Sequence, residues 1–116
     1  MAACVDAKNI ICKHVRSSLT YYVDLTDRLG DGTVVAVLDL VADDVLLTLS
    51  GEAVISTEGD FPGPCGTDVT IAAGKGLFFT ASGGTTGSRA TITVEFEKDN
   101  GDVDAVQLLM DVYGTE

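Results

Sequence analysis

Residues 90–113 decide the fold class, and they read ATITVEFEKDNGDVDAVQLLMDVY. The first seven residues alternate strictly, with Ala90, Ile92, Val94 and Phe96 on one face and threonine or glutamate between them. A hydrophobic period of two is typical of a β-strand that buries one face and leaves the other in solvent. The C-terminal part of the chain therefore predicts at least one half-buried strand.

The dipeptide Asn100-Gly101 follows this strand and predicts a hairpin. Asn-Gly is the strongest short-range hairpin signal, because both residues tolerate the positive φ that a type I′ turn requires. Residues 104–113 then return as the partner strand. The side chains that we expect to face the core from it are Val106, Leu108, Met110 and Val112.

Similar β-rich runs, separated by Gly and Asp turns, extend toward the N-terminus. Residues 19–25 alternate with Tyr21 and Val23 on the core side, and residues 57–67, which hold both prolines, are predicted to be a surface loop. The remaining predicted strands cover residues 33–41, 45–49, 52–56, 68–72 and 77–81. Seven or eight short strands at this spacing favour an all-β sandwich or barrel.

The length of 116 residues fits one domain with its own core. We expect a single antiparallel β-sandwich over residues 19–116, preceded by an N-terminal arm over residues 1–18. Residues 8–16 leave two alternatives open, since Ile10 and Ile11 suit either a short strand or an extended arm.

The net charge of −11 makes nucleic acid and anionic membranes unfavourable partners, because both are negatively charged. The charge is unevenly distributed along the chain. Residues 1–16 carry three basic groups and one acidic group, whereas residues 17–116 carry four basic and seventeen acidic groups. A basic arm on an acidic body favours contact with a neighbouring copy or another acidic surface. The alternative is a solvated tail without a partner.

Catalytic chemistry finds little support in the residue pattern. His14 is the only histidine, and one imidazole near Cys12 completes neither a catalytic triad nor a metal site. Cys65 has no base near it in the sequence, which favours an inert thiol. We therefore expect no enzyme activity, no cofactor and no metal site.

Two further patterns have simple structural explanations. Residues 99–104 gather acidic and amide side chains that could bind calcium, but turn chemistry alone accounts for such a hairpin tip. The glycine-rich segments 74–76 and 83–87 each lead into a strand rather than a helix, unlike a phosphate-binding loop.

Several motifs resemble those of small structural proteins of tailed bacteriophages, of the fibre–tail adaptor type. The relevant stretches are residues 71–87, which read IAAGKGLFFTASGGTTG, the threonine-rich strand 90–96, the Asn100-Gly101 turn and the opening strand at 21–29. The resemblance covers roughly residues 19–113. It implies an immunoglobulin-like sandwich and a role in particle architecture, without an active site.

We therefore expect a bacteriophage virion structural protein that acts by protein–protein contact. It would be a tail adaptor at the fibre attachment site or a decoration protein on the capsid, assembled in the host cytoplasm, oligomeric, and bound to other phage structural proteins. The alternative is a carbohydrate- or calcium-binding β-sandwich module. The residues expected to bind partners are Lys8, Ile10, Ile11, Lys13, Arg16, Phe61 and Pro62.

Overall fold

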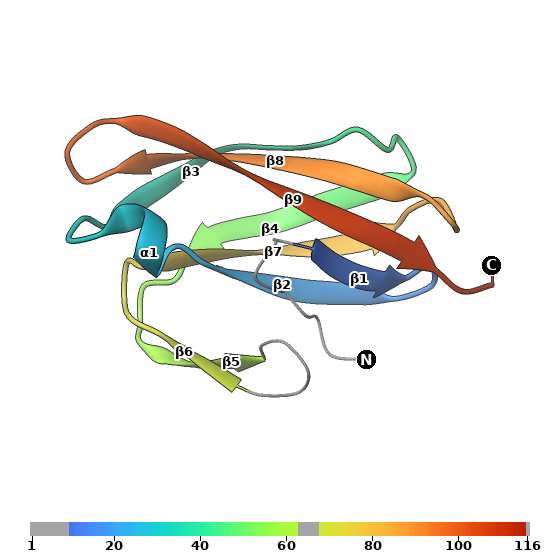
Figure 1. Ribbon diagram of the computed structural model, residues 1–116, viewed down its shortest axis with the longest axis horizontal. Coiled ribbons are helices and arrows are strands. Elements are labelled where there is room, and N and C mark those ends of the chain that lie inside the picture. The colour runs from blue at the N-terminus through green and yellow to red at the C-terminus, as the bar shows by residue number, and fades with distance from the viewer. Residues whose placement is uncertain (1–9, 63–67, 116) are drawn as a thin grey trace.

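The computed structural model describes residues 10–62 and 68–115, except for the side chains of Ile10, Ile11 and Pro62. The chain forms two β-sheets packed face to face, as Figure 1 shows, with the one-turn helix α1 (Thr26–Leu29) at one end. The expected all-β sandwich is confirmed.

One sheet has four strands in the order β1-β9-β8-β3, and the other has three in the order β2-β7-β4. The order C-F-G of the immunoglobulin fold corresponds to β3-β8-β9, and the order B-E-D to β2-β7-β4. A separate hairpin, β5-β6, lies outside the three-stranded sheet (Figure 1). The strand bounds are β1 Ile10–His14, β2 Ser18–Asp24, β3 Val34–Ala42, β4 Leu47–Val54, β5 Gly59–Pro62, β6 Asp68–Ile71, β7 Gly76–Gly83, β8 Arg89–Lys98 and β9 Val103–Tyr113.

The described residues form nine strands, rather than the expected seven or eight, because β1 and β5 are added while two predicted strands merge into one. Residues 45–49 and 52–56, predicted as separate strands, belong to the single strand β4, whose register shifts between Ser50 and Ala53. Within the expected loop 57–67, residues 59–62 form β5 and pair with β6. Residues 63–67 lie outside the described part of the chain.

The expected arm is in part a strand of the sandwich. Residues 10–14 form β1, which runs parallel to β9, so the sheets are not wholly antiparallel. The backbone N–H of Val15 continues this pairing with a 2.8 Å hydrogen bond to the Tyr113 carbonyl, and the Val15 side chain is buried. The open alternative at the start of the chain is thereby resolved in favour of a strand, while residues 1–9 are outside the description.

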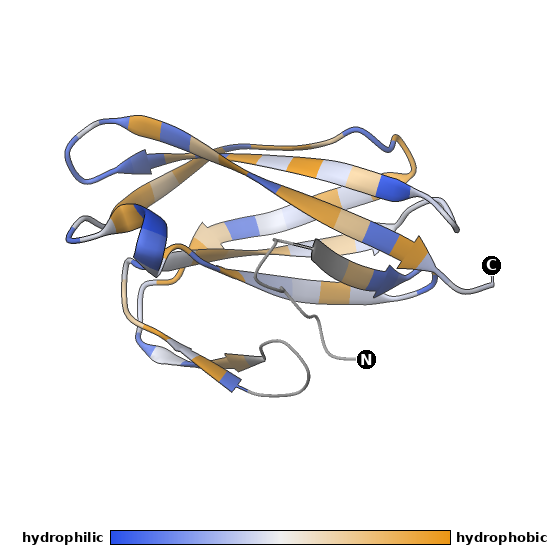
Figure 2. Cartoon of the chain, viewed as in Figure 1, coloured by the Kyte–Doolittle hydropathy of each residue, from blue (hydrophilic) through white to orange (hydrophobic). Residues whose placement is uncertain are grey.

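The core lies between the two sheets, where alternate residues of each strand meet. Figure 2 shows the alternation of hydrophobic and hydrophilic residues along β9. Tyr21 is fully buried, with its ring stacked 5.9 Å from Phe79 and its hydroxyl donating to the Cys12 carbonyl at 3.1 Å. The eight residues of the C-terminal hairpin expected in the core are all buried, namely Ala90, Ile92, Val94, Phe96, Val106, Leu108, Met110 and Val112.

The hairpin between β8 and β9 has a longer loop than the expected type I′ turn. The Gly101 N–H donates to the Lys98 carbonyl at 2.9 Å, and the Lys98 N–H donates to the Asp102 carbonyl at 2.8 Å. Asn100 instead accepts from the Asp102 N–H through its side-chain oxygen at 3.0 Å. A three-residue loop closed by a glycine with φ of 89° results.

Lys13 is a buried cation, only 1% exposed, held by backbone carbonyls. Its Nζ donates to the carbonyls of His14 at 2.7 Å, Val15 at 3.3 Å and Gly83 at 2.8 Å. Three acceptors match the three N–H donors of an ammonium group, which offsets part of its desolvation. Because Gly83 ends β7, this one side chain connects the first strand of the four-stranded sheet to the three-stranded sheet.

Replacing Lys13 with methionine is expected to destabilise the protein by about 1–3 kcal/mol, since the Val15 and Gly83 carbonyls lose their donor. Urea unfolding followed by circular dichroism measures the change. Arg16→Met, at an exposed position three residues away, is the control and should shift stability by less than about 0.5 kcal/mol. A Lys13→Met variant as stable as the wild type would contradict a stabilising carbonyl cage.

Stability should depend on pH in the alkaline range in two opposite ways. Burial lowers the pKa of Lys13, so between that pKa and about 10.4 the unfolded chain binds more protons and stability rises with pH. Burial raises the pKa of Tyr21, so above about 10 the unfolded chain loses its proton first and stability falls. The free energy of unfolding, measured from about pH 8 to 12, should no longer rise with pH in Lys13→Met and should no longer fall at high pH in Tyr21→Phe.

Candidate partner-binding surfaces

The residues expected to bind partners from the N-terminal segment are separated by the structure. Lys8 lies outside the described residues, and Ile10 and Ile11 belong to β1. Lys13 is buried among carbonyls, so it cannot contact a partner, and that expectation is wrong. Arg16 is exposed in the turn between β1 and β2, and it is the one of these side chains that the structure shows in solvent.

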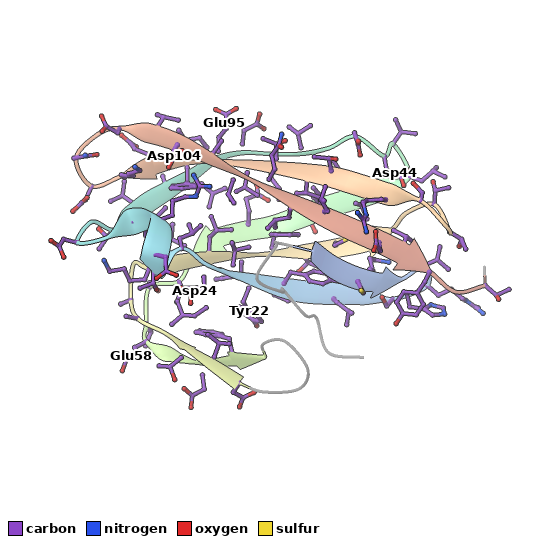
Figure 3. The ribbon with its side chains drawn as sticks, in the orientation of Figure 1. Tyr22, Asp24, Asp44, Glu58, Glu95 and Asp104 are labelled. Carbon is purple, nitrogen blue, oxygen red and sulfur yellow. The ribbon has the colours of Figure 1, made fainter. Side chains whose placement is uncertain are left out.

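Phe61 and Pro62 lie on the hairpin rather than in a loop, as the last two residues of β5. The Phe61 ring packs 4.7 Å from the ring of Tyr22, which projects from the outer face of the three-stranded sheet toward the hairpin (Figure 3). Tyr22 is in turn 6.0 Å from Phe78. These aromatic contacts attach the hairpin to the sheet, so part of the Phe61 side chain is used internally.

Three of the exposed large apolar side chains of the described residues lie on β3, an edge strand of the four-stranded sheet. Its pairing with β8 shifts register between Val34 and Ala36 and again between Val37 and Asp39. Each irregularity inserts one extra residue, which changes the alternation of side chains between the faces. As a result Val35, Leu38 and Val41 are 53%, 50% and 51% exposed, and we call these three residues the β3 strip.

The apolar surface continues past the end of β3. Val45 is 96% exposed and Leu46 is 60% exposed, in the connection that leads to β4. Such a concentration of large apolar side chains on one edge is typical of surfaces that bind other proteins. The same irregularities hinder another strand from pairing along this edge, so a partner would contact side chains rather than add a strand.

Two acidic residues lie within this surface. Asp39 and Glu95 are paired across β3 and β8, and both are exposed on the outer face, where Figure 3 shows Glu95. Among the described ion pairs neither carboxylate has a basic partner. Like charges directly opposite one another destabilise a sheet, and a cation from a binding partner would relieve the repulsion.

Sequence reasoning missed the β3 strip, although residues 33–41 contain a signal for it. Apolar residues occupy both phases of the run VVAVLDLV, which is more than one buried face of an edge strand can accommodate. Such an excess predicts either a strand buried on both faces or an irregular edge strand. Only the position of β3 at the edge of its sheet shows that it is the irregular edge strand and not the strand buried on both faces.

Asp44 has a structural role at the start of the β3–β4 connection (Figure 3). Its carboxylate accepts from the Leu46 N–H at 2.9 Å, the Thr85 N–H at 2.9 Å and the Thr85 hydroxyl at 3.2 Å. The neighbouring Asp43 accepts from the Thr91 N–H at 2.8 Å. The Asp44 bonds hold the glycine-rich segment 83–87 against the connection that carries Val45, and the Asp43 bond attaches the same connection to β8.

Asp44→Ala is expected to lower the free energy of unfolding by about 1–3 kcal/mol, because the N–H groups of Leu46 and Thr85 lose a charged acceptor. Thermal and urea denaturation measure the loss. Asp31→Ala, at an exposed turn position, provides a control of equal charge change. Equal stability of the two variants would show that the Asp44 bonds contribute nothing.

Both glycine-rich segments serve turns and close packing. A Cβ on Gly83 would lie 2.4 Å from the Leu46 carbonyl oxygen, and one on Gly76 would lie 2.6 Å from the Val23 carbonyl oxygen. Lys75, between Gly74 and Gly76, donates to the carbonyl of Gly30 at 2.7 Å. Their glycines are therefore explained by packing, without a bound phosphate.

The acidic side chains at the tip of the β8–β9 hairpin interact with neighbouring groups of the same domain. Asp104 lies 3.4 Å from Arg28 and 3.6 Å from Lys98, and the Asn100 amide donates to Asp102 at 3.2 Å. The pKa of Asp104 is lowered mainly by the hydrogen bond from the Ala105 N–H and, to a smaller extent, by the positive charges of Arg28 and Lys98. Over residues 10–62 and 68–115, no group of three or more His, Cys, Asp or Glu side chains is arranged to hold a metal ion.

His14 is a surface residue with structural contacts. Its ring packs edge-on against Tyr113 with centroids 5.4 Å apart, and its Nδ1 accepts from the Arg16 N–H at 3.1 Å. These contacts hold the turn that presents Arg16. Arg89 and Asp111 form an ion pair between β8 and β9. The Arg89 guanidinium donates hydrogen bonds to both carboxylate oxygens of Asp111, which lowers the pKa of Asp111.

No family model matches the sequence, and comparison with curated proteins and with solved structures finds no significant similarity. In the described part of the chain, no helix is long and apolar enough to cross a membrane. The surfaces must therefore be interpreted from their own residues.

Proposed function

We propose that this protein is a structural component of a tailed-bacteriophage particle and that it works by protein–protein contact. The motif resemblance over roughly residues 19–113 supports a place at the tail–fibre junction or on the capsid. The observation that carries the proposal is the β3 strip, whose three apolar side chains are each at least half exposed. Because these side chains are already about half buried, completing their burial in an interface is favourable by about 1 kcal/mol each, roughly half the value for a fully exposed side chain.

The chemistry of the surface defines its partner. An apolar patch around the Asp39–Glu95 pair suits a partner with apolar side chains and at least one lysine or arginine. In a second copy, Arg16 provides such a cation, because it is exposed in the turn between β1 and β2. We therefore propose that neighbouring copies contact one another in this way.

The sheet order makes such contacts head-to-tail. β1 and β3 lie on opposite edges of the four-stranded sheet, so a copy that binds through one edge leaves the other edge free. Contacts of this heterologous kind generate rings when the rotation closes. A ring of copies suits the junction between a tail and its fibres, and many weak contacts act together in such an assembly.

The double variant Leu38→Lys/Val41→Lys tests this function. Its new cations lie beside Asp39 and Glu95, so the fold should be at least as stable as the wild type. We expect it to lose the apolar contact, to remain monomeric by analytical ultracentrifugation and to be missing from purified particles produced with its neighbouring genes.

The matched control is Thr48→Lys/Ser50→Lys, which places the same charges at exposed positions of β4, an edge strand of the other sheet. It should assemble more efficiently than the β3 variant. Normal incorporation of the β3 variant would refute the role of the strip, and a wild-type protein that never sediments with particles would refute the virion assignment.

A further inference from the structure

A hollow of about 330 Å³ lies where the hairpin meets the outer face of the three-stranded sheet. Its lining comprises Phe61 from β5, Phe78 from β7 and residues 53–57. Ser56 and Thr57 in this segment are exposed, so hydroxyl groups accompany the two aromatic rings. The volume is at the lower end of the range for pockets that bind small molecules.

A regular array of hydroxyl groups continues from the hollow along the same face. Strand registers place outward side chains of β2, β7 and β4 in three rungs, of which one is aromatic and two consist of serine and threonine. We call the two hydroxyl rungs the hydroxyl grid. The rungs are Ser18–Ser82–Thr48, Thr20–Thr80–Ser50 and Tyr22–Phe78–Ala53.

The array is uncharged in a protein with eighteen acidic residues. None of its nine positions holds a charged side chain, whereas the outer face of the other sheet carries Asp39, Glu95, Glu97, Arg89 and Asp111. The nearest carboxylates on these strands belong to Asp24, at the end of β2, and Glu52, at the register shift of β4, so they border the array rather than belong to it. The charge distribution therefore favours a neutral, hydroxyl-rich partner over an ionic one.

We propose that the hollow and the hydroxyl grid bind a neutral oligosaccharide. Serine and threonine hydroxyls both donate and accept hydrogen bonds, as sugar hydroxyls do. The apolar C–H face of a sugar ring packs well on aromatic rings such as Phe78 and Phe61. The Oγ atoms of Thr20 and Thr80 are 3.2 Å apart, so each orients the other and limits the entropy lost on binding.

The size of the face supports a small ligand rather than another protein. Three strands about 4.8 Å apart and three rungs about 6.8 Å apart cover on the order of 300 Å², margins included. A stable protein interface buries about 800 Å² on each partner. The hairpin, attached through Phe61 and Tyr22, also stands above one end of the face and obstructs a flat protein surface.

The test is an NMR titration of the 116-residue chain with maltohexaose, cellohexaose and laminarihexaose, each raised into the millimolar range. We expect saturable shifts for Tyr22, Phe78 and the grid residues with at least one of the three. Thr80→Val should weaken that binding by about three- to tenfold, the loss expected for one hydrogen bond. Thr93→Val, at the matching central position of the other sheet, should leave the affinity unchanged.

Three results of the titration would overturn the inference. These are no shift with any of the sugars, shifts on residues elsewhere, and equal affinity of Thr80→Val and wild type. Dimerisation of the protein through this face, detected by ultracentrifugation and abolished by Ser50→Arg, would also overturn it. Because these variants leave the β3 strip intact, the outcome is separate from that of the particle-assembly experiment.

Discussion

The backbone at Gly83 and Gly84 is the constraint on which the closure of the sandwich depends. The Gly83 carbonyl accepts from the buried Lys13, and the Gly84 N–H donates to the Leu46 carbonyl at 3.0 Å. A Cβ at Gly84 would lie 3.0 Å from Val112. Strands β1, β4, β7 and β9 thus meet at two residues without side chains. A larger residue at Gly83 would clash with the Leu46 carbonyl and displace the start of β4 from the end of β7.

Closure of this end also explains why β1 belongs to the domain rather than to an arm. Backbone groups of alternate residues face opposite sides of a strand, so the Val15 bond to β9 implies that the Cys12 and His14 carbonyls face away from β9. Tyr21 and Lys13 donate to these two carbonyls. The free edge of β1 is therefore covered by side chains of its own domain, which disfavours addition of a foreign strand.

The core and the edge at β1 make their contacts within the domain. The two outer faces of the sandwich remain available to partners, and they differ in chemistry. The face of the four-stranded sheet combines apolar side chains with unbalanced carboxylates, which suits a basic and apolar protein partner. The face of the three-stranded sheet has hydroxyl groups and aromatic rings without charge, which suits a neutral polar ligand. Two distinct binding surfaces on one small domain are compatible with anchoring by one and recognition by the other.

The sequence by itself determined the all-β class, the strands 90–96 and 104–113 and the core faces of both, because alternation is a local property that the pleat converts directly into burial. It did not determine that Lys13 is buried, that β3 presents Leu38 to solvent, or that Ser50 lies beside Thr80. Each of these depends on pairing between segments far apart in the chain. Register and sheet order decide such pairings, and one extra residue in a strand is enough to exchange its faces.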